Sequence, residues 1–94
     1  IEGLVRSAAA TYAGRGVRVN AVAPGLVRTP LSQRITSSPK SEAFSTALHP
    51  LGRLGEPDDI GSVIEFLLSP VSSWVTGQIW GVDGGLATIK NRSE

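Results

Sequence analysis

One short segment of the chain combines a flexible backbone position with groups that could hold a polar ligand. Gly25 lets a ligand approach the main chain closely, because glycine has no Cβ. Main-chain N–H and C=O groups near Val27 could pair with a carboxamide, and the Thr29 hydroxyl can donate or accept a hydrogen bond. A plain strand-ending turn explains the same residues without a ligand, and the residues alone favour that turn. The candidate binding residues are Pro24, Gly25, Leu26, Val27 and Thr29.

The other residues that could do chemistry have simpler explanations. His49 is the only histidine and has no cysteine to act with it, so we interpret it as a loop residue beside Pro50 and not as a metal ligand. Asp58 and Asp59 stand in the predicted first turn of a helix, where carboxylates favour the positive end of the dipole. Glu65 is expected on the solvated face of that helix.

Three further side chains are expected to serve the fold. We interpret Trp74 and Trp80 as core or interface anchors, because aromatic side chains bury large areas at such positions. Asn20 is predicted to satisfy nearby backbone groups, since its amide both donates and accepts hydrogen bonds. None of these residues by itself indicates a reaction.

Two helices and two strands are predicted to position the candidate binding residues. Apolar residues at helical spacing indicate a helix at each of two places, the first ending near Gly14 or Gly16. Proline suits the first position of the second helix. Largely apolar runs with β-branched residues predict two strands, the first of them buried. The predicted helices span residues 1–12 and 57–68, and the predicted strands span residues 17–23 and 78–82.

Residues 26–50 show no strong periodicity. Residues 36–41 are the most loop-like part, and residues 42–48 are compatible with a short helix. A stretch of this length without periodicity is usually a functional loop or a mobile one. We therefore expect residues 31–49 to be mobile in the absence of a ligand.

The order of elements predicts an incomplete α/β sheet. Two strands joined through a helix are most often parallel, with a right-handed crossover, and parallel strands are normally covered on both faces. Two strands and two helices cannot provide that cover, so we expect one edge of a larger sheet that is molten or aggregated when expressed alone. The helical pattern already runs at Ile1, without Met or a capping residue, which we interpret as a cut through a helix.

Composition excludes several classes of protein. The 94 residues carry a net charge of +1, and the basic residues are scattered, so the footprint of a nucleic-acid-binding surface is missing. No apolar run approaches the roughly 20 residues that span a bilayer. The chain has no cysteine and therefore no disulfide framework, which agrees with a cytoplasmic protein.

Three co-linear segments identify a resemblance. Residues 18–30 read RVNAVAPGLVRTP, residues 50–60 read PLGRLGEPDDI, and residues 76–85 read TGQIWGVDGG. In this order and at this spacing they resemble the short-chain dehydrogenase/reductase family, and in particular its classical members similar to 3-oxoacyl-ACP reductases. The resemblance covers residues 1 to about 87. It implies the C-terminal part of a Rossmann-type, doubly wound parallel sheet, ordered helix-strand-loop-helix-strand.

The resemblance also implies a function and assigns roles to segments. The family moves hydride between NAD or NADP and a carbonyl or alcohol substrate. By resemblance, the segment from Pro24 to Thr29 contacts the nicotinamide, residues 31–49 form the substrate lid, and residues 88–94 are a tail. The intact parent is expected to be a dimer or tetramer, with interfaces on the first helix, the second helix and the last strand.

The catalytic residues are expected elsewhere. The family's serine, tyrosine and lysine would precede Ile1, and Tyr12 is not that tyrosine because Gly16 stands where the lysine would be. We therefore expect the fragment alone to be inactive. An alternative is a non-enzymatic fragment that binds a partner chain through its apolar faces. The substrate and the choice between NAD and NADP depend on segments outside these residues.

Overall fold

The computed structural model describes residues 1–90, which contain two strands and several helices. The predicted tail, residues 88–94, falls outside the described residues from position 91 onward. No helix in the described range is long and apolar enough to cross a membrane. The elements are α1 (Glu2–Tyr12), η1 (Ala13–Arg15), β1 (Ala21–Pro24), α2 (Gln33–Thr36), α3 (Pro39–Leu48), α4 (Pro57–Leu68), η2 (Pro70–Ser72) and β2 (Ile79–Val82).

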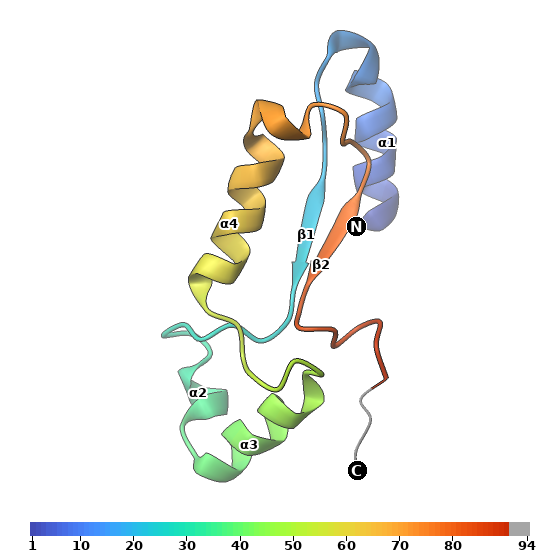
Figure 1. The fold of residues 1–94 in the computed structure, drawn as a ribbon. Helices are drawn as coiled ribbons and strands as arrows, with labels where there is room; N and C mark the ends of the chain where they lie inside the picture. The colour runs from blue at the N-terminus through green and yellow to red at the C-terminus, as the bar shows by residue number, and fades with distance from the viewer. Residues whose placement is uncertain (91–94) are drawn as a thin grey trace.

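The two strands pair in parallel, as predicted. Ala21 lies opposite Ile79 at one end of the sheet, and Pro24 lies opposite Val82 at the other. The chain passes from β1 to β2 through α4, which packs against both strands, while α1 lies on the opposite side (Figure 1). Two parallel strands with a helix on each side form one part of an α/β sandwich.

The first strand is shorter than the sequence predicts. We expected it over residues 17–23, but β1 spans Ala21–Pro24. The reason is that side chains replace part of the regular ladder before Ala21. The Asn20 amide donates to the Val75 carbonyl at 3.1 Å and accepts from the Gln78 N–H at 3.1 Å, and the Thr76 hydroxyl accepts from the Val19 N–H at 3.1 Å. The predicted role of Asn20 is confirmed, and the second strand begins one residue later than expected.

The prediction that β1 is buried is wrong for the described part of the chain. Ala21 and Val22 are half-buried, whereas Ala23 and Pro24 are exposed. The physical reason is that β2 is the one strand paired with β1 among residues 1–90, so one edge of β1 has no strand beside it. The apolar sequence of β1 predicts a strand with neighbours on both edges, and residues 1–90 provide a neighbour on one edge only.

The apolar stripe of α1 is only partly covered. Val5 and Ala9 are buried, while Ile1 and Leu4 are exposed. The helix ends as predicted: a 3₁₀ turn follows Tyr12, and Gly16 takes the left-handed conformation with φ 74°. Glycine adopts that conformation without the steric cost that a Cβ brings.

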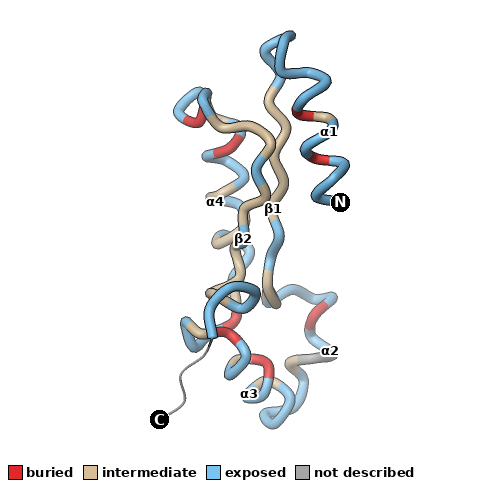
Figure 2. The backbone as a smooth tube through the Cα atoms, turned by 90° about the vertical axis from the view of Figure 1, so that its right-hand side faces the viewer, coloured by how far each residue is buried: buried red, intermediate tan, exposed pale blue. Residues whose placement is uncertain are grey.

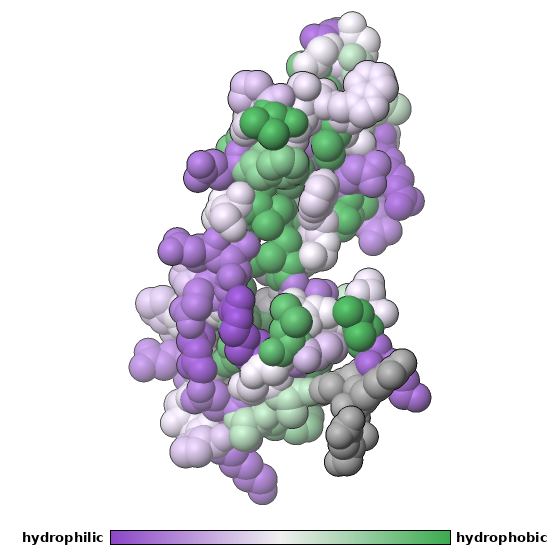
Figure 3. All heavy atoms as spheres, in the orientation of Figure 1, coloured by the Kyte–Doolittle hydropathy of each residue, from purple (hydrophilic) through white to green (hydrophobic). Residues whose placement is uncertain are grey.

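The arrangement is elongated, and several apolar side chains lie at its surface. The radius of gyration is 15.9 Å, against about 12 Å for a compact domain of this length. In Figure 2 the few buried positions are scattered among exposed backbone, and in Figure 3 apolar side chains gather along the strands between α1 and α4. Trp74 is 98% exposed and is therefore not a core residue of the described chain, so the interface alternative stays a prediction. Trp80 is half-buried, and its ring forms a T-shaped pair with that of Phe66, with a centroid distance of 6.0 Å.

The segment between β1 and α4 is more helical than the sequence predicts. We expected a loop over residues 36–41, but α2 ends at Thr36 and α3 begins at Pro39. The Ser38 hydroxyl caps α3 by accepting a hydrogen bond from the Ser41 N–H at 3.1 Å. Serine followed by proline is a typical helix start, and this local signal extends the predicted helix toward its N-terminus.

Helix α4 matches its prediction and is held at its far end by an arginine. Pro57 occupies the first turn, and the helix ends before Ser69. The Arg18 guanidinium donates to the carbonyl of Leu67 at 2.9 Å and to that of Val75 at 3.1 Å. These carbonyls belong to the C-terminal end of α4 and to the segment that leads into β2. Arg18 therefore joins the segment before β1 to the end of α4 and to the segment before β2.

Candidate functional site

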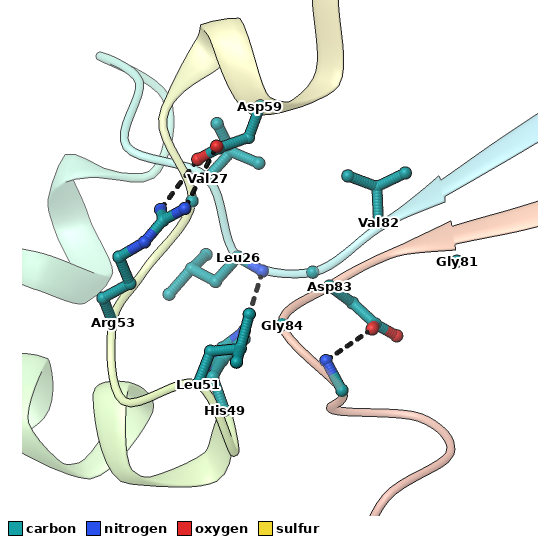
Figure 4. A pocket seen from close by; sticks show the side chains of 13 residues that line it. Leu26, Val27, His49, Leu51, Arg53, Asp59, Gly81, Val82, Asp83 and Gly84 are labelled. Atoms are coloured by element: carbon teal, nitrogen blue, oxygen red, sulfur yellow. Dashed lines mark hydrogen bonds and ion pairs between the residues drawn. The ribbon is translucent and has the colours of Figure 1, made fainter. Parts of the chain in front are cut away.

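A cavity of about 360 Å³ opens where both strands end at their carboxyl sides. Ligands in open α/β sheets bind beyond these strand ends, so the location agrees with a binding role. Figure 4 shows that its walls come from the end of β1, the end of β2 and the segment between α3 and α4. The lining residues are Gly25, Leu26, Val27, His49, Leu51, Arg53, Gly55, Asp59, Gly81, Val82, Asp83, Gly84 and Gly85.

The candidate binding residues are divided between the cavity and its surroundings. Gly25, Leu26 and Val27 line the cavity, whereas Pro24 ends β1 and does not line it. Thr29 also lies outside the lining and borders a separate shallow pocket. Three of the five binding residues that the sequence predicts therefore line the cavity.

Gly25 is required here by the packing of the protein. The Gly25 N–H donates to the Val82 carbonyl at 3.1 Å and thereby continues the pairing beyond β1. A Cβ built on Gly25 would lie 2.9 Å from His49 Nε2 and 3.0 Å from the Cα of Asp83. Any larger residue would collide with both neighbours. The structure thus supplies a reason for glycine that the sequence interpretation, which considered ligand approach, did not include.

The Leu26–Val27 backbone is held in an extended position beside Gly55. The Leu26 carbonyl accepts from the Gly55 N–H at 2.9 Å, and the Arg28 N–H donates to the Gly55 carbonyl at 2.8 Å. The Val27 carbonyl accepts from the Ser32 hydroxyl at 2.7 Å. The Val27 N–H has no hydrogen-bond partner among residues 1–90. Val27 therefore presents one unpaired main-chain donor and a carbonyl with one lone pair remaining.

His49 is the cavity residue that the sequence interpretation underestimated. It is a loop residue beside Pro50, as predicted, but it is only 4% exposed and lines the cavity. Its Nε2 lies 3.2 Å from the Leu26 N–H nitrogen, and its Nδ1 lies 2.7 Å from the Ser45 carbonyl oxygen. Both contacts are satisfied by the neutral ring with its proton on Nδ1. Its position directly before the 50–60 segment was the signal that could have linked it to the site.

The charged side chains that line the cavity already have partners: Arg53 pairs with Asp59, and Asp83 accepts hydrogen bonds from backbone N–H groups. The Arg53 guanidinium forms two hydrogen bonds with the Asp59 carboxylate, at 2.8 Å and 3.1 Å. This interaction and the Glu56 N–H, at 2.7 Å, lower the pKa of Asp59 to about 2. The carboxylate is therefore ionised at neutral pH and stabilises the start of α4, which confirms the predicted helix-start role of Asp59.

Asp83 shapes the turn after β2. Its carboxylate accepts from the N–H of Gly85 at 2.9 Å and from the N–H of Ala87 at 3.1 Å. Gly84 and Gly85 have positive φ values of 59° and 93°, which a residue with a Cβ rarely adopts. The Gly84 carbonyl accepts from the Leu51 N–H at 3.0 Å and joins this turn to the segment after α3.

Thr29 and Arg28 form contacts away from the cavity. The Thr29 hydroxyl accepts from the Ser32 N–H at 3.1 Å, and the Ser32 hydroxyl accepts from the Thr29 N–H at 2.9 Å. Arg28 pairs with Glu42 of α3 and lies 3.6 Å from Glu56, and these contacts raise the pKa of its guanidinium. Arg28 does not line the cavity.

The chemistry available in the cavity is binding. Each of its four titratable side chains, those of His49, Arg53, Asp59 and Asp83, is already engaged with a partner within the chain. The walls otherwise consist of apolar side chains and backbone. Such a cavity suits a flat ring with a polar substituent that main-chain groups can recognise.

Comparison with known proteins places this geometry in a family. The family model described as Enoyl-(Acyl carrier protein) reductase matches residues 1–87. The chain is 46% identical over 84 residues to a 3-oxoacyl-(acyl-carrier-protein) reductase of Thermotoga maritima, with 89% of this chain and 33% of the relative covered. It is 51% identical over 84 residues to a galactitol 2-dehydrogenase of Cereibacter sphaeroides, with coverages of 87% and 32%.

Solved structures agree with the sequence relatives. A 4-hydroxyisoleucine dehydrogenase complexed with NADH superposes with a TM-score of 0.89 at 31% identity, covering 95% of this chain and 37% of that one. A putative 2-deoxy-D-gluconate 3-dehydrogenase of Agrobacterium tumefaciens with bound NADP gives a TM-score of 0.88 at 32% identity, with coverages of 94% and 36%. The chain thus spans about a third of the length of these proteins. It belongs to the short-chain dehydrogenase/reductase family and carries part of that family's Rossmann-type α/β fold.

Proposed function

We propose that this chain forms the nicotinamide end of the cofactor site in an NAD(P)-dependent oxidoreductase. The enzyme would transfer hydride between the nicotinamide and a carbonyl or alcohol substrate. Two observations carry this proposal: the Val27 N–H is unpaired among residues 1–90, and Val27 lines a cavity at the carboxyl ends of two parallel strands. A carboxamide oxygen can accept from that N–H, and the remaining lone pair of the Val27 carbonyl can accept from the carboxamide nitrogen.

The size and polarity of the cavity suit one end of a dinucleotide. A volume of about 360 Å³ is near the lower limit for ligand pockets, which run from about 300 to 1,000 Å³. The whole dinucleotide would require further walls, and none of the eleven glycines in the chain forms the family's pyrophosphate loop. The neighbours that carry NADH or NADP in their structures support a cofactor of the same class here.

Other parts of the enzyme would supply the reaction. In our proposal the serine, tyrosine and lysine of the family stand outside these 94 residues, and the chain alone is inactive. Helices α2 and α3, within residues 31–49, would form the lid over the substrate. The arrangement supports this, since α3 ends at Leu48 and the next residue, His49, lines the cavity.

The exposed apolar faces favour a larger assembly. Leu4 of α1 is 73% exposed, Leu68 of α4 is 79% exposed and Trp74 is 98% exposed, so apolar side chains lie uncovered on both sides of the strands. We propose that the rest of the enzyme covers part of this surface and that a second subunit covers α4 and β2, giving a homo-oligomer. Capture of an unrelated partner chain by the same faces is the alternative that we proposed from the sequence.

The cofactor role can be tested with a ligand that lacks only the nicotinamide. The full-length protein is titrated calorimetrically with NADH and with ADP-ribose, while amide exchange is followed at Leu26 and Val27. If the enzyme uses NADPH, the two ligands are NADPH and ADP-ribose that carries the 2′-phosphate. We expect NADH to slow exchange at Val27 and ADP-ribose to leave it unchanged. Equal effects of the two ligands, or none, would show that the nicotinamide does not bind at this cavity.

A further inference from the structure

His49 joins two segments that are far apart in the sequence and meet at the cavity. It stands at the C-terminal end of α3, and its ring reaches the backbone that follows β1, 23 residues earlier. The side chain is 4% exposed, and the nearby Ser45 is also buried. Its contacts are therefore made within the protein and depend little on solvent.

The ring is oriented by one bond so that it can form the other. The Ser45 carbonyl lies 2.7 Å from Nδ1, and a carbonyl can only accept, so the ring proton resides on Nδ1. Nε2 is then unprotonated and accepts from the Leu26 N–H at 3.2 Å. The ring lies close to the strand end, since a Cβ on Gly25 would come within 2.9 Å of Nε2.

The bond with His49 holds the peptide unit directly before the one that carries the Val27 N–H, and so restricts rotation of the backbone at Leu26. The Leu26 N–H is held by His49, and the Leu26 carbonyl is held by the Gly55 N–H at 2.9 Å. The peptide plane that contains this carbonyl also contains the Val27 N–H, because the six atoms of a peptide unit are coplanar. With both polar groups of Leu26 bound, the unpaired donor of Val27 is held in one orientation toward its ligand.

We propose that His49 is a positioning residue for the cofactor: its unprotonated Nε2 holds the Leu26–Val27 backbone in the orientation that recognises the nicotinamide carboxamide. The inference rests on the proposed function of the cavity. It assigns His49 no contact with the reacting atoms and no proton transfer. The proposal also connects α3 to cofactor binding, because His49 is the C-cap residue of that helix.

Two substitutions separate the two bonds of the ring. The amide of Gln reaches the position of Nε2, so His49→Gln retains an acceptor for the Leu26 N–H. The amide of Asn reaches only the position of Nδ1, so His49→Asn retains the donor to Ser45 and loses the bond to Leu26. Each variant loses one hydrogen bond of the parent, and thermal unfolding of both provides the matched measure of stability.

The test is the affinity of the full-length variants for NADH and for ADP-ribose, or for NADPH and its 2′-phosphate counterpart. We expect His49→Asn to weaken dinucleotide binding by about three- to thirtyfold and to leave the nicotinamide-free ligand unaffected. His49→Gln is expected to bind both ligands as the parent does. Amide exchange at Leu26 should accelerate in His49→Asn and remain slow in His49→Gln.

Different failures identify different errors. If the parent distinguishes NADH from ADP-ribose but the two variants bind NADH equally well, the positioning role is overturned and the proposed function stands. If both variants lose affinity for both ligands equally, His49 acts only through the fold, and the proposal is also overturned. If the parent shows no contribution from the nicotinamide, the proposed function fails and the positioning role fails with it, whatever the exchange at Leu26.

Discussion

Replacing Thr29 by Val tests whether this residue holds the cofactor or only shapes a turn. Valine has nearly the same shape as threonine but lacks the hydroxyl. In the structure that hydroxyl accepts from the Ser32 N–H at 3.1 Å and lies 3.4 Å from the Ser32 Oγ. Its own proton thus has only a long internal contact, which leaves it able to donate to a cofactor.

Two magnitudes follow from these contacts. Loss of the hydrogen bond to Ser32 should lower the free energy of unfolding by about 1 kcal/mol, whether or not Thr29 binds a ligand. Loss of a hydrogen bond to the cofactor costs about 0.5–3 kcal/mol, depending on charge and burial. The cofactor affinity should therefore fall by about twofold to a hundredfold.

The assay is cofactor titration of the full-length variants, with urea unfolding measured in parallel. Thr29→Ser keeps the hydroxyl and should lose much less affinity than Thr29→Val. Arg28→Gln serves as the matched control, because the adjacent Arg28 guanidinium is already paired with Glu42 and Glu56; the cofactor affinity of this variant should change little. If Thr29→Val loses stability as expected but binds cofactor as tightly as the parent, the segment is a structural turn and the cofactor role of Thr29 is wrong.

Four further outcomes are expected in the full-length protein. Arg18→Lys should lower the free energy of unfolding by about 1–3 kcal/mol in urea, because an ammonium cannot span the carbonyls at the end of α4 and before β2. Asp59 has a lowered pKa of about 2, so its contribution to stability is present above about pH 4 and is lost as the pH falls toward 2. Asp59→Asn should remove that part of the pH dependence in acid unfolding, and an unchanged profile would contradict the role of its ion pair with Arg53. Cofactor and substrate together should slow hydrogen exchange in residues 31–49, and equal exchange with and without them would refute a lid. Trp80→Ala should weaken subunit assembly in light scattering, whereas a monomeric parent would refute the interface.

The helix boundaries could be predicted from the sequence because they depend on residues that are close together in the chain. The apolar spacing of α4, the proline in its first turn and the glycine after η1 each act over a few residues, so the sequence pattern predicted these boundaries closely. The parallel pairing of β1 with β2 also followed, since a strand joined to another through a helix has little other choice. Gly25, Leu26 and Val27 were found for the same reason, because they directly follow a recognisable strand.

The remaining parts of the site depend on residues that are distant in the sequence. Asn20 shortens the strands through bonds to residues 55 and 58 positions away, and no periodicity records such a contact. His49 was interpreted as an ordinary loop histidine because its partner, the Leu26 N–H, is a backbone group that every residue except proline possesses.

The sequence by itself determined the family, the parallel α/β pattern and the strand end at which a ligand would bind. Only the tertiary structure decided which of these residues face the cavity, that Thr29 forms its contacts with Ser32, and that Gly25 is required by His49 and Asp83. The physical reason is that helix and strand propensity act between near neighbours in the chain. The direction of a side chain and the identity of its hydrogen-bond partner are set when packing brings distant segments together.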